Sequence, residues 1–273
     1  MRETCIVLGL CILAVALRAS KLVFIRKLGA FTFVVVSFLV FYYLSGKNLS
    51  VGIFGGLIWL FLPWVELLTR IRRMKLPMEN HLKHAQPPNA AFFPNAEETI
   101  HAMTESGFER VADCCWHWSG MHQHYCMFVH PESGTIASLS LCEQSDVAFS
   151  FVSITSIGED ATIWRTTNYP FAPTLLYPQR HFWNHVPCSR HCFHEILQNH
   201  TSFLKAKKVH QDQISRPDPD QLDELVEEEM EEMIAYNLER GIIEYSDEEC
   251  FRYSKRGLFF LWGQFIKDML RLC

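Results

Sequence analysis

The side chains best suited to chemistry are cysteines and histidines, and they gather in two parts of the sequence. Zinc needs about four such side chains around one ion, and a short Cys-x2-Cys pair is its usual signature. Neither group contains such a pair, so both are interpreted first as surface histidines and buried thiols. The groups are Cys114, Cys115, His117, His122, His124 and Cys126, and His181, His185, Cys188, His191, Cys192 and His194.

The second group contains the better zinc candidate. The spacings Cys188-x3-Cys192 and His191-x2-His194 would place four ligands on one side of the start of a helix. The candidate metal ligands are therefore Cys188, His191, Cys192 and His194. We nevertheless predict that the chain binds no metal and no cofactor.

Nucleophilic catalysis is the other chemistry open to these residues. A catalytic cysteine needs a thiolate beside a histidine and donors for an oxyanion, and these two groups could supply many such pairs. The sequence has no Gly-x-Ser-x-Gly elbow, P-loop or dinucleotide fingerprint that would localise a site. We therefore name no catalytic residue, and an enzyme using a Cys/His site remains the alternative.

Charge divides the chain into two unequal parts. Residues 1–75 carry a net charge of +8, whereas residues 76–273 carry −13. This asymmetry is expected of a membrane anchor followed by an acidic soluble part. An acidic domain repels a phosphate backbone, so nucleic acid is not an expected partner.

Residues 218–232 contain nine carboxylates and neither lysine nor arginine. A di-iron carboxylate site would also need Glu-x-x-His motifs, and this run contains no histidine. The pattern therefore favours a solvated helix face opposite a Leu/Met stripe. The residues assigned to that face are Glu227, Glu228, Glu231 and Glu232.

The ten cysteines indicate reduced thiols in a cytoplasmic domain. Cys5 and Cys11 lie in an apolar segment, and Cys114 and Cys115 are adjacent. A secreted domain of this size would have a sparser and more even disulfide framework.

Two uncharged stretches, residues 28–46 and 48–65, each approach the 20 or so residues that cross a bilayer as a helix. The link Ser-Gly-Lys-Asn at residues 45–48 is too short for anything except antiparallel neighbours. Four cations precede the hairpin at residues 18–27, four follow it at residues 70–75, and only Lys47 lies in its turn. The sequence predicts a transmembrane hairpin with both ends in the cytoplasm. Gly52, Gly55 and Gly56 would permit close helix contact.

Residues 5–17 form a shorter apolar run that admits three interpretations. A short transmembrane helix with its N-terminus outside keeps the cations of residues 18–27 in the cytoplasm and is preferred. A cleaved signal peptide and an interfacial helix remain open.

The soluble part is predicted to be an α+β domain. A proline-containing linker ends near residue 94, and a helix at 96–106 follows, with Asn95 and Glu98 as a capping box and Gly107 as its terminator. Short turns then separate strands that should form an antiparallel β-meander flanked by helices. These strands are expected at residues 108–118, 123–130, 135–142, 147–156 and 161–167.

A proline-bearing loop should lead to a second helix at 190–204, capped by Ser189. Asp218 should cap a third helix that ends at Gly241, before a hairpin at 242–245 and 250–254. The last helix, residues 258–272, has one broad apolar face. We expect this face to dock on the domain core, with the membrane surface as the alternative.

Two segments carry a resemblance to a known group of proteins. Residues 62–70, Leu-Pro-Trp-Val-Glu-Leu-Leu-Thr-Arg, and residues 252–262, Arg-Tyr-Ser-Lys-Arg-Gly-Leu-Phe-Phe-Leu-Trp, resemble segments of an uncharacterised family of bacterial membrane-anchored proteins. The resemblance implies a bacterial membrane protein and implies no activity or ligand.

Together these patterns predict an integral protein of the bacterial cytoplasmic (inner) membrane with its C-terminal domain in the cytoplasm. We expect a non-catalytic interaction or sensing module whose partners are the lipid bilayer and a protein; the alternatives are an enzyme or a zinc-binding domain. The predicted divisions are 1–27, a short hydrophobic helix and basic segment; 28–69, the transmembrane hairpin; 70–94, the basic juxtamembrane linker; 95–210, the α+β domain; and 211–273, the acidic helix, β-hairpin and amphipathic helix.

Overall fold

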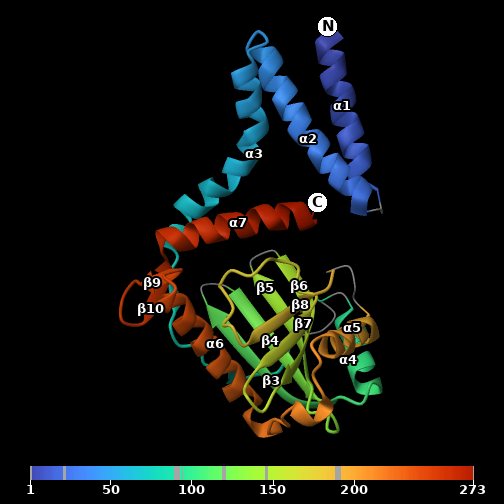
Figure 1. The fold of residues 1–273 in the computed structure, drawn as a ribbon, viewed down its shortest axis with the longest axis vertical. Coiled ribbons are helices and arrows are strands. Elements are labelled where there is room, and N and C mark those ends of the chain that lie inside the picture. The colour runs from blue at the N-terminus through green and yellow to red at the C-terminus, as the bar shows by residue number, and fades with distance from the viewer. Residues whose placement is uncertain are drawn as a thin grey trace.

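The computed structural model describes residues 2–20, 23–88, 93, 95–118, 121–144, 147–187 and 192–272. Within these residues the chain forms helices, a large mixed sheet and a small second sheet. The apolar N-terminal helices stand at one end of the molecule and the large sheet lies at the other, with α7 crossing between them (Figure 1). The predicted α+β class is confirmed.

Three N-terminal helices lie beside one another: α1 (Arg2–Arg18), α2 (Val23–Leu44) and α3 (Leu49–Thr69). α2 and α3 each contain a stretch that is long and apolar enough to cross a membrane. The side chain of Asn48 accepts hydrogen bonds from the amides of Ser50 and Val51 and so caps α3. The tight turn makes α2 and α3 an antiparallel hairpin, and Trp59 Nε1 donates across it to Ser37 Oγ at 2.8 Å.

The large sheet has the strand order β2-β3-β4-β5-β6-β7-β8. Strands β3 to β7 follow one another as antiparallel neighbours, so the predicted meander is present. The strands are β2 (Lys83–His84), β3 (Glu109–Trp118), β4 (Met121–Val129), β5 (Ile136–Gln144), β6 (Val147–Ile157), β7 (Ile163–Thr167) and β8 (His181–His185).

The large sheet is extended at one edge by a strand that was not predicted. β8 pairs parallel to β7, with Arg165 opposite Trp183. This segment was interpreted as loop because prolines surround it, but it contains a strand of five residues. Its place depends on partners in β7, and these are not visible in a local pattern.

The linker expected at residues 70–94 is also partly structured. It contains the 3₁₀ helix η1 (Ile71–Arg73) and two short strands. β1 (Leu76–Pro77) pairs with β10 (Cys250–Tyr253), which pairs with β9 (Ile243–Tyr245), and β2 pairs with β3. Because both strands pair with distant parts of the chain, the segment after α3 is held against the domain.

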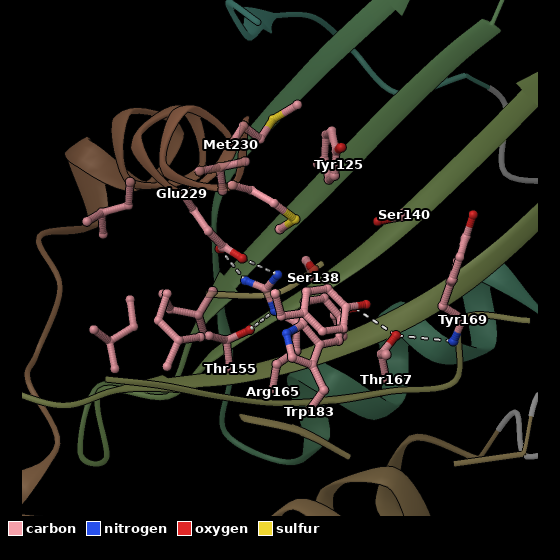
Figure 2. Close-up of a pocket in the computed structure, with 18 of the residues that line it drawn as sticks. Tyr125, Ser138, Ser140, Thr155, Arg165, Thr167, Tyr169, Trp183, Glu229 and Met230 are labelled. Atoms are coloured by element: carbon pink, nitrogen blue, oxygen red, sulfur yellow. Dashed lines mark hydrogen bonds and ion pairs between the residues drawn. The ribbon is translucent and has the colours of Figure 1, made fainter. Parts of the chain in front are cut away.

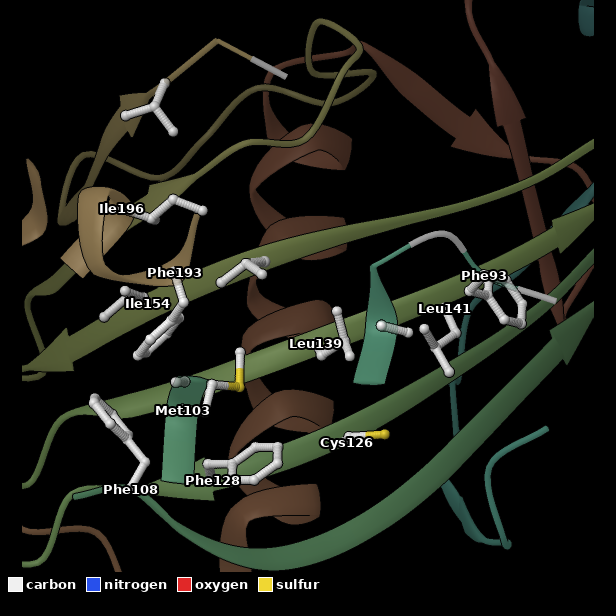
Figure 3. Close-up of a cluster of buried hydrophobic side chains, with 14 residues drawn as sticks. Phe93, Met103, Phe108, Cys126, Phe128, Leu139, Leu141, Ile154, Phe193 and Ile196 are labelled. Carbon is white, nitrogen blue, oxygen red and sulfur yellow. The ribbon is translucent and has the colours of Figure 1, made fainter. Parts of the chain in front are cut away.

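Two helices cover one face of the large sheet: α4 (Ala96–Glu105) and α5 (Phe193–Ala206). Phe108, Phe128 and Phe193 are fully buried between these helices and the sheet (Figure 3). His200 is also buried there, and its two ring nitrogens lie 3.0 Å from the hydroxyls of Ser156 and Thr166. Burial lowers the pKa of His200 to about 4, so this histidine is a neutral member of the core.

The predicted helix boundaries agree with the structure more closely than the predicted N-terminal caps do. Asn95 has a left-handed conformation (φ 64°) and its side chain makes no capping hydrogen bond, so the predicted capping box is absent. Gly107 has φ +83° and ends α4 as expected. The predicted cap Ser189 lies outside the described residues. Asp218 caps the 3₁₀ turn η4 (Pro219–Gln221), and α6 (Leu222–Glu239) begins after it.

α6 covers the opposite face of the sheet, so the sheet lies between two helical layers (Figure 1). Its C-terminal half contributes Ile234 to a separate apolar cluster that also contains Leu67 of α3 and residues of β9, β10 and α7 (Lys255–Leu272). The last helix docks on this separate cluster through the buried side chains of Leu258 and Leu261, so it packs on the small sheet, α6 and the end of α3 and not in the clusters of the large sheet.

The docking face of α7 differs from the expected apolar face. The polar side chain of Gln264 is buried, and Asp268 accepts a hydrogen bond from the amide of Ala172 at 2.6 Å. Phe259 remains largely exposed and packs edge-on against Trp64 of α3. α7 therefore contacts both the domain and the apolar hairpin.

The close approach of α2 and α3 gives a matched pair of tests. A methyl group at Gly55 would lie 2.5 Å from Cβ of Phe41, whereas one at Gly56 would lie 3.6 Å from Cβ of Phe38. Both substitutions by alanine gain about 1 kcal/mol of helix propensity, so only the contact differs between them. We expect Gly55→Ala to lower the melting temperature of the detergent-purified protein and Gly56→Ala to maintain or raise it. Equal melting temperatures would contradict this packing.

Candidate functional site

The main cavity of the domain lies between α6 and the face of the sheet that α4 and α5 do not cover. Its volume is about 420 Å³. The lining side chains come from β4, β5, β6 and β7, from β8 and the segment before it, and from α6. Figure 2 shows these side chains converging from the sheet and the helix. A cavity of this size falls in the range of small-molecule pockets.

The cavity exists because small side chains occupy the middle of this sheet face. In β5, Ser138 and Ser140 face the cavity, whereas Leu139 and Leu141 point into the opposite core. In β6, Ser153 takes the equivalent place opposite Ser138. Three serines leave space that larger side chains would fill, and they supply hydroxyl groups to the lining.

A buried ion pair crosses the cavity. Arg165 of β7 makes two hydrogen bonds to the carboxylate of Glu229 in α6, at 2.7 and 2.6 Å. Only 18% of the arginine side chain and 10% of the glutamate side chain are exposed. The Nε of Arg165 also donates to Thr155 Oγ1 at 2.9 Å, so the guanidinium is held in one orientation.

Aromatic rings pack against the guanidinium group of Arg165. The guanidinium carbon of Arg165 lies 5.0 Å from the ring centre of Trp183 in β8. Trp183 in turn stacks on Tyr177, with ring centres 4.1 Å apart and planes inclined by 10°. The parallel pairing of β8 with β7 is what brings Trp183 under Arg165.

A second aromatic group lines another part of the cavity, formed by Tyr125, Phe151 and Tyr169. Phe151 and Tyr169 meet edge-on, with ring centres 4.8 Å apart. Burial raises the pKa of the Tyr125 hydroxyl above its usual value and raises the pKa of Tyr169 to about 12. Both phenols are therefore neutral hydrogen-bonding groups at physiological pH.

α6 closes the cavity with flexible apolar side chains. Met230 and Met233 of α6 line it, together with Leu225 and Val226. Methionine adapts to ligands of different shape because its side chain is unbranched and polarizable. The arrangement can bind a small, largely apolar molecule and orient it with a few polar groups. The described residues that line it include neither cysteine nor histidine.

The structure describes only two of the four candidate zinc ligands that the sequence suggested. Cys188 and His191 lie outside the described residues. Cys192 is exposed at the start of α5, and Nε2 of His194 lies 3.3 Å from the hydroxyl of Ser106 at the end of α4. His181, from the same sequence group, instead meets α6, with its Nε2 3.1 Å from a carboxylate oxygen of Glu232.

The first Cys/His group is spread along the paired strands β3 and β4. Cys126 is buried in the core below α4 and α5, whereas Cys114 is buried on the α6 side. His117 and His122 lie opposite one another, with ring centres 5.9 Å apart. Alternation along the strands thus separates residues that are close in the sequence.

The interpretation of the acidic run as a solvated face was wrong for part of it. Glu228 and Glu231 are exposed as expected. Glu232 pairs with Arg180 and His181, and Glu227 accepts a hydrogen bond from the amide of Leu82. Burial opposes ionisation of Glu232, but Arg180 and His181 lower its pKa overall.

Comparison of the chain with protein-family models, curated proteins and solved structures found no match. The resemblance of residues 62–70 and 252–262 to bacterial membrane-anchored proteins therefore stays a prediction.

Sequence reasoning did not identify Arg165, Trp183 or Glu229. The Ser-Leu-Ser-Leu alternation at residues 138–141 was a usable signal, because it marks one buried face of small polar residues. The lone cation of a predicted strand, Arg165, was another.

The buried pair has a measurable signature. Arg165→Met or Glu229→Leu alone should cost about 3 kcal/mol of unfolding free energy, because each leaves one buried charge unpaired. The double variant should recover most of that loss. The matched control is Glu244→Gln, which breaks the exposed pair with Arg252 and should cost less than about 1 kcal/mol. Additive losses in the double variant, measured by denaturant unfolding, would contradict the pairing.

Proposed function

We propose that this protein is a membrane-anchored sensing module whose cytoplasmic domain binds a small, largely apolar molecule in the cavity between the sheet and α6. The observation that carries the proposal is the cavity itself, with the Arg165–Glu229 pair at one side and serine hydroxyls along its floor. The ligand class follows from this lining: a flat apolar body for the aromatic rings and one or two hydroxyl or carbonyl groups for the serines.

The exposed surface of α2 and α3 supports the membrane anchor. Only 11% and 17% of their most apolar stretches are buried inside the protein. Phe31 of α2 and Phe54, Phe61 and Val65 of α3 are all more than half exposed. A helix in the core of a soluble protein would be covered, whereas helices in a bilayer present such side chains to lipid.

The position of α1 favours three membrane crossings. α1 packs along α2, and Glu3 at its start lies 2.9 Å from Lys47 in the α2–α3 turn. This pair puts the N-terminus and the turn on one side, away from the sheet domain. With 17 residues α1 is about 25 Å long, slightly shorter than the hydrocarbon core.

We infer the orientation of the hairpin in the membrane from the distribution of its flanking cations. The end of α3 near the domain is followed by Arg70, Arg72, Arg73 and Lys75, whereas the turn at the far end has Lys47 alone. The positive-inside rule then places the domain in the cytoplasm. The resemblance of two segments to bacterial proteins makes the inner membrane the matching location.

Direct contacts provide a route from the cavity to the anchor. α6 lines the cavity and continues through β9 and β10 into α7. Trp262 of α7 donates a hydrogen bond to the carbonyl of Leu60 in α3 at 2.7 Å and stacks on Trp64. A ligand that moves α6 would therefore change the contact between α7 and the membrane hairpin.

The cavity favours binding over the enzymatic alternative. A Cys/His nucleophile would have to face the bound molecule, and the cavity-lining residues described above offer tyrosines, serines and glutamates of α6 instead. The carboxylate of Glu229 already accepts two hydrogen bonds from Arg165 and is poorly placed to act as a base.

A cavity-filling variant tests the binding proposal. The probe is 2-naphthol, a flat apolar molecule with one hydroxyl group, added to the detergent-purified chain. At a free concentration about ten times its dissociation constant, it should stabilise the wild-type fold by about 1.4 kcal/mol. Ser138→Leu should abolish this effect by filling the cavity. Ser202→Leu, on the exposed side of α5, should retain it. Equal stabilisation of both variants would place the binding elsewhere.

Topology is tested separately with fusions. Alkaline phosphatase, which is active only after export, should be inactive when fused after residue 75, while a fluorescent protein that matures in the cytoplasm should be bright there. A phosphatase fused within the turn at Lys47 should be active. High phosphatase activity after residue 75 would overturn the orientation.

A further inference from the structure

Three potential metal ligands from distant segments meet at the edge of the large sheet. They are His84 of β2, Cys114 of β3 and Asp223 in the first turn of α6. Each offers one ligand atom, and these atoms all lie within 4.8 Å of one another. This group differs from the one that sequence spacing suggested, because His84 lies in the segment expected to be linker.

The three ligand atoms are close enough for a small rotation of the His84 ring to bring them around one zinc ion, because the two shortest separations involve different nitrogens of that ring. Cys114 Sγ lies 3.7 Å from His84 Nδ1, and His84 Nε2 lies 3.3 Å from an oxygen of Asp223. Ligands at 2.0–2.3 Å around a tetrahedral ion stand about 3.3–3.8 Å apart. Only one nitrogen of the imidazole ring can bind the ion, which leaves the other for a hydrogen bond.

The backbone already holds two of the three ligands. His84 and Cys114 are directly opposite one another in the antiparallel pair β2–β3, so their side chains lie on the same face of the sheet. Cys114 is buried, whereas 73% of the His84 side chain and 22% of the Asp223 side chain are exposed. An ion can therefore reach the group from solvent and find a protected sulfur ligand.

The surroundings are suited to a cation. Glu227 follows Asp223 by one helical turn, and its carboxylate contacts Nδ1 of His81 at 3.3 Å as well as the amide of Leu82. Two carboxylates of α6 thus face the segment that contains β2. The fourth position of a tetrahedral ion is left to water.

We propose that His84, Cys114 and Asp223 bind one Zn²⁺ ion that fastens the juxtamembrane strand β2 to the sheet and to α6. The set of one sulfur, one nitrogen and one oxygen ligand suits zinc better than magnesium or calcium, which prefer oxygen alone. On binding, the Cys114 thiol releases its proton to water and the thiolate takes its place on the ion; no electron is transferred.

The zinc site would connect the segment that follows the membrane hairpin with α6, the helix that lines the cavity. β2 follows the end of α3 by a short segment, and Asp223 precedes the cavity residue Glu229 by less than two helical turns. An ion here would limit movement of the start of α6 relative to the membrane hairpin. The inference does not depend on what the cavity binds.

The test uses the full-length protein, purified in detergent after growth with added zinc. We expect about one zinc ion per chain by elemental mass spectrometry. Replacement by Co²⁺ should give a thiolate-to-cobalt charge-transfer band, which requires sulfur ligation. His84→Ala should reduce both signals at least tenfold, and Cys114→Ala should do the same. His84 is exposed, so its loss should leave the fold intact, as a thermal melt will verify.

Two matched controls make the outcome specific. Cys115→Ala, the next residue in β3, and His101→Ala, an exposed histidine of α4, should keep the full zinc content and the cobalt band. A wild-type protein without stoichiometric zinc or a cobalt–thiolate band would overturn the proposal. Zinc retained by folded His84→Ala would also overturn it, because the ion would then be bound by other residues.

Discussion

The attachment of α6 to the sheet is the constraint on which most of the structure depends. Arg165 and Glu229 meet through two parallel hydrogen bonds in a largely buried place. A buried ion pair adds little net stability compared with apolar side chains of the same volume, because both charges lose their hydration. We therefore expect its main effect to be geometric. The planar guanidinium and carboxylate fit together in one orientation, and this holds the helix at a fixed place above the sheet.

The two faces of the sheet use that constraint differently. Between the sheet and the helices α4 and α5, large side chains such as Phe108, Phe128 and Phe193 are buried in one apolar cluster. Between α6 and the sheet, serines in β5 and β6 leave a cavity, and the ion pair connects the helix to the sheet beside it. The same alternation of side chains along each strand thus produces an apolar core on one face and a cavity on the other.

α7 and the short strands join this domain to the apolar hairpin. β1 pairs with β10, and Trp262 and Phe259 of α7 pack against the end of α3. One apolar cluster therefore contains residues from α3, α6, the small sheet and α7. Because these elements share a cluster, the domain is packed against the hairpin and is not joined to it by a linker alone. Packed side chains thus connect α6 with α3, so a movement of α6 would change the packing against α3.

The sequence by itself determined the elements that depend on local rules. Apolar runs with a four-residue turn predicted the helical hairpin, β-branched and aromatic segments between turn residues predicted β3 to β7, and Gly107 and Gly241 marked the ends of helices. These signals lie within a few residues of the structure they specify. The same pattern also predicted the amphipathic α7, although it misjudged Gln264.

Only the tertiary structure decided which side chains meet. β8 was hidden among prolines, and its strand conformation depends on pairing with β7. Arg165, Trp183 and Glu229 come from three segments, as do His84, Cys114 and Asp223. Such groups form when distant segments pair through space, and pairing energy depends on burial and register that no local pattern records. Spacing along the chain therefore offered candidate metal ligands only in residues 188–194, whereas the fold brought together three residues from different segments, with Asp223 more than a hundred positions after His84 and Cys114.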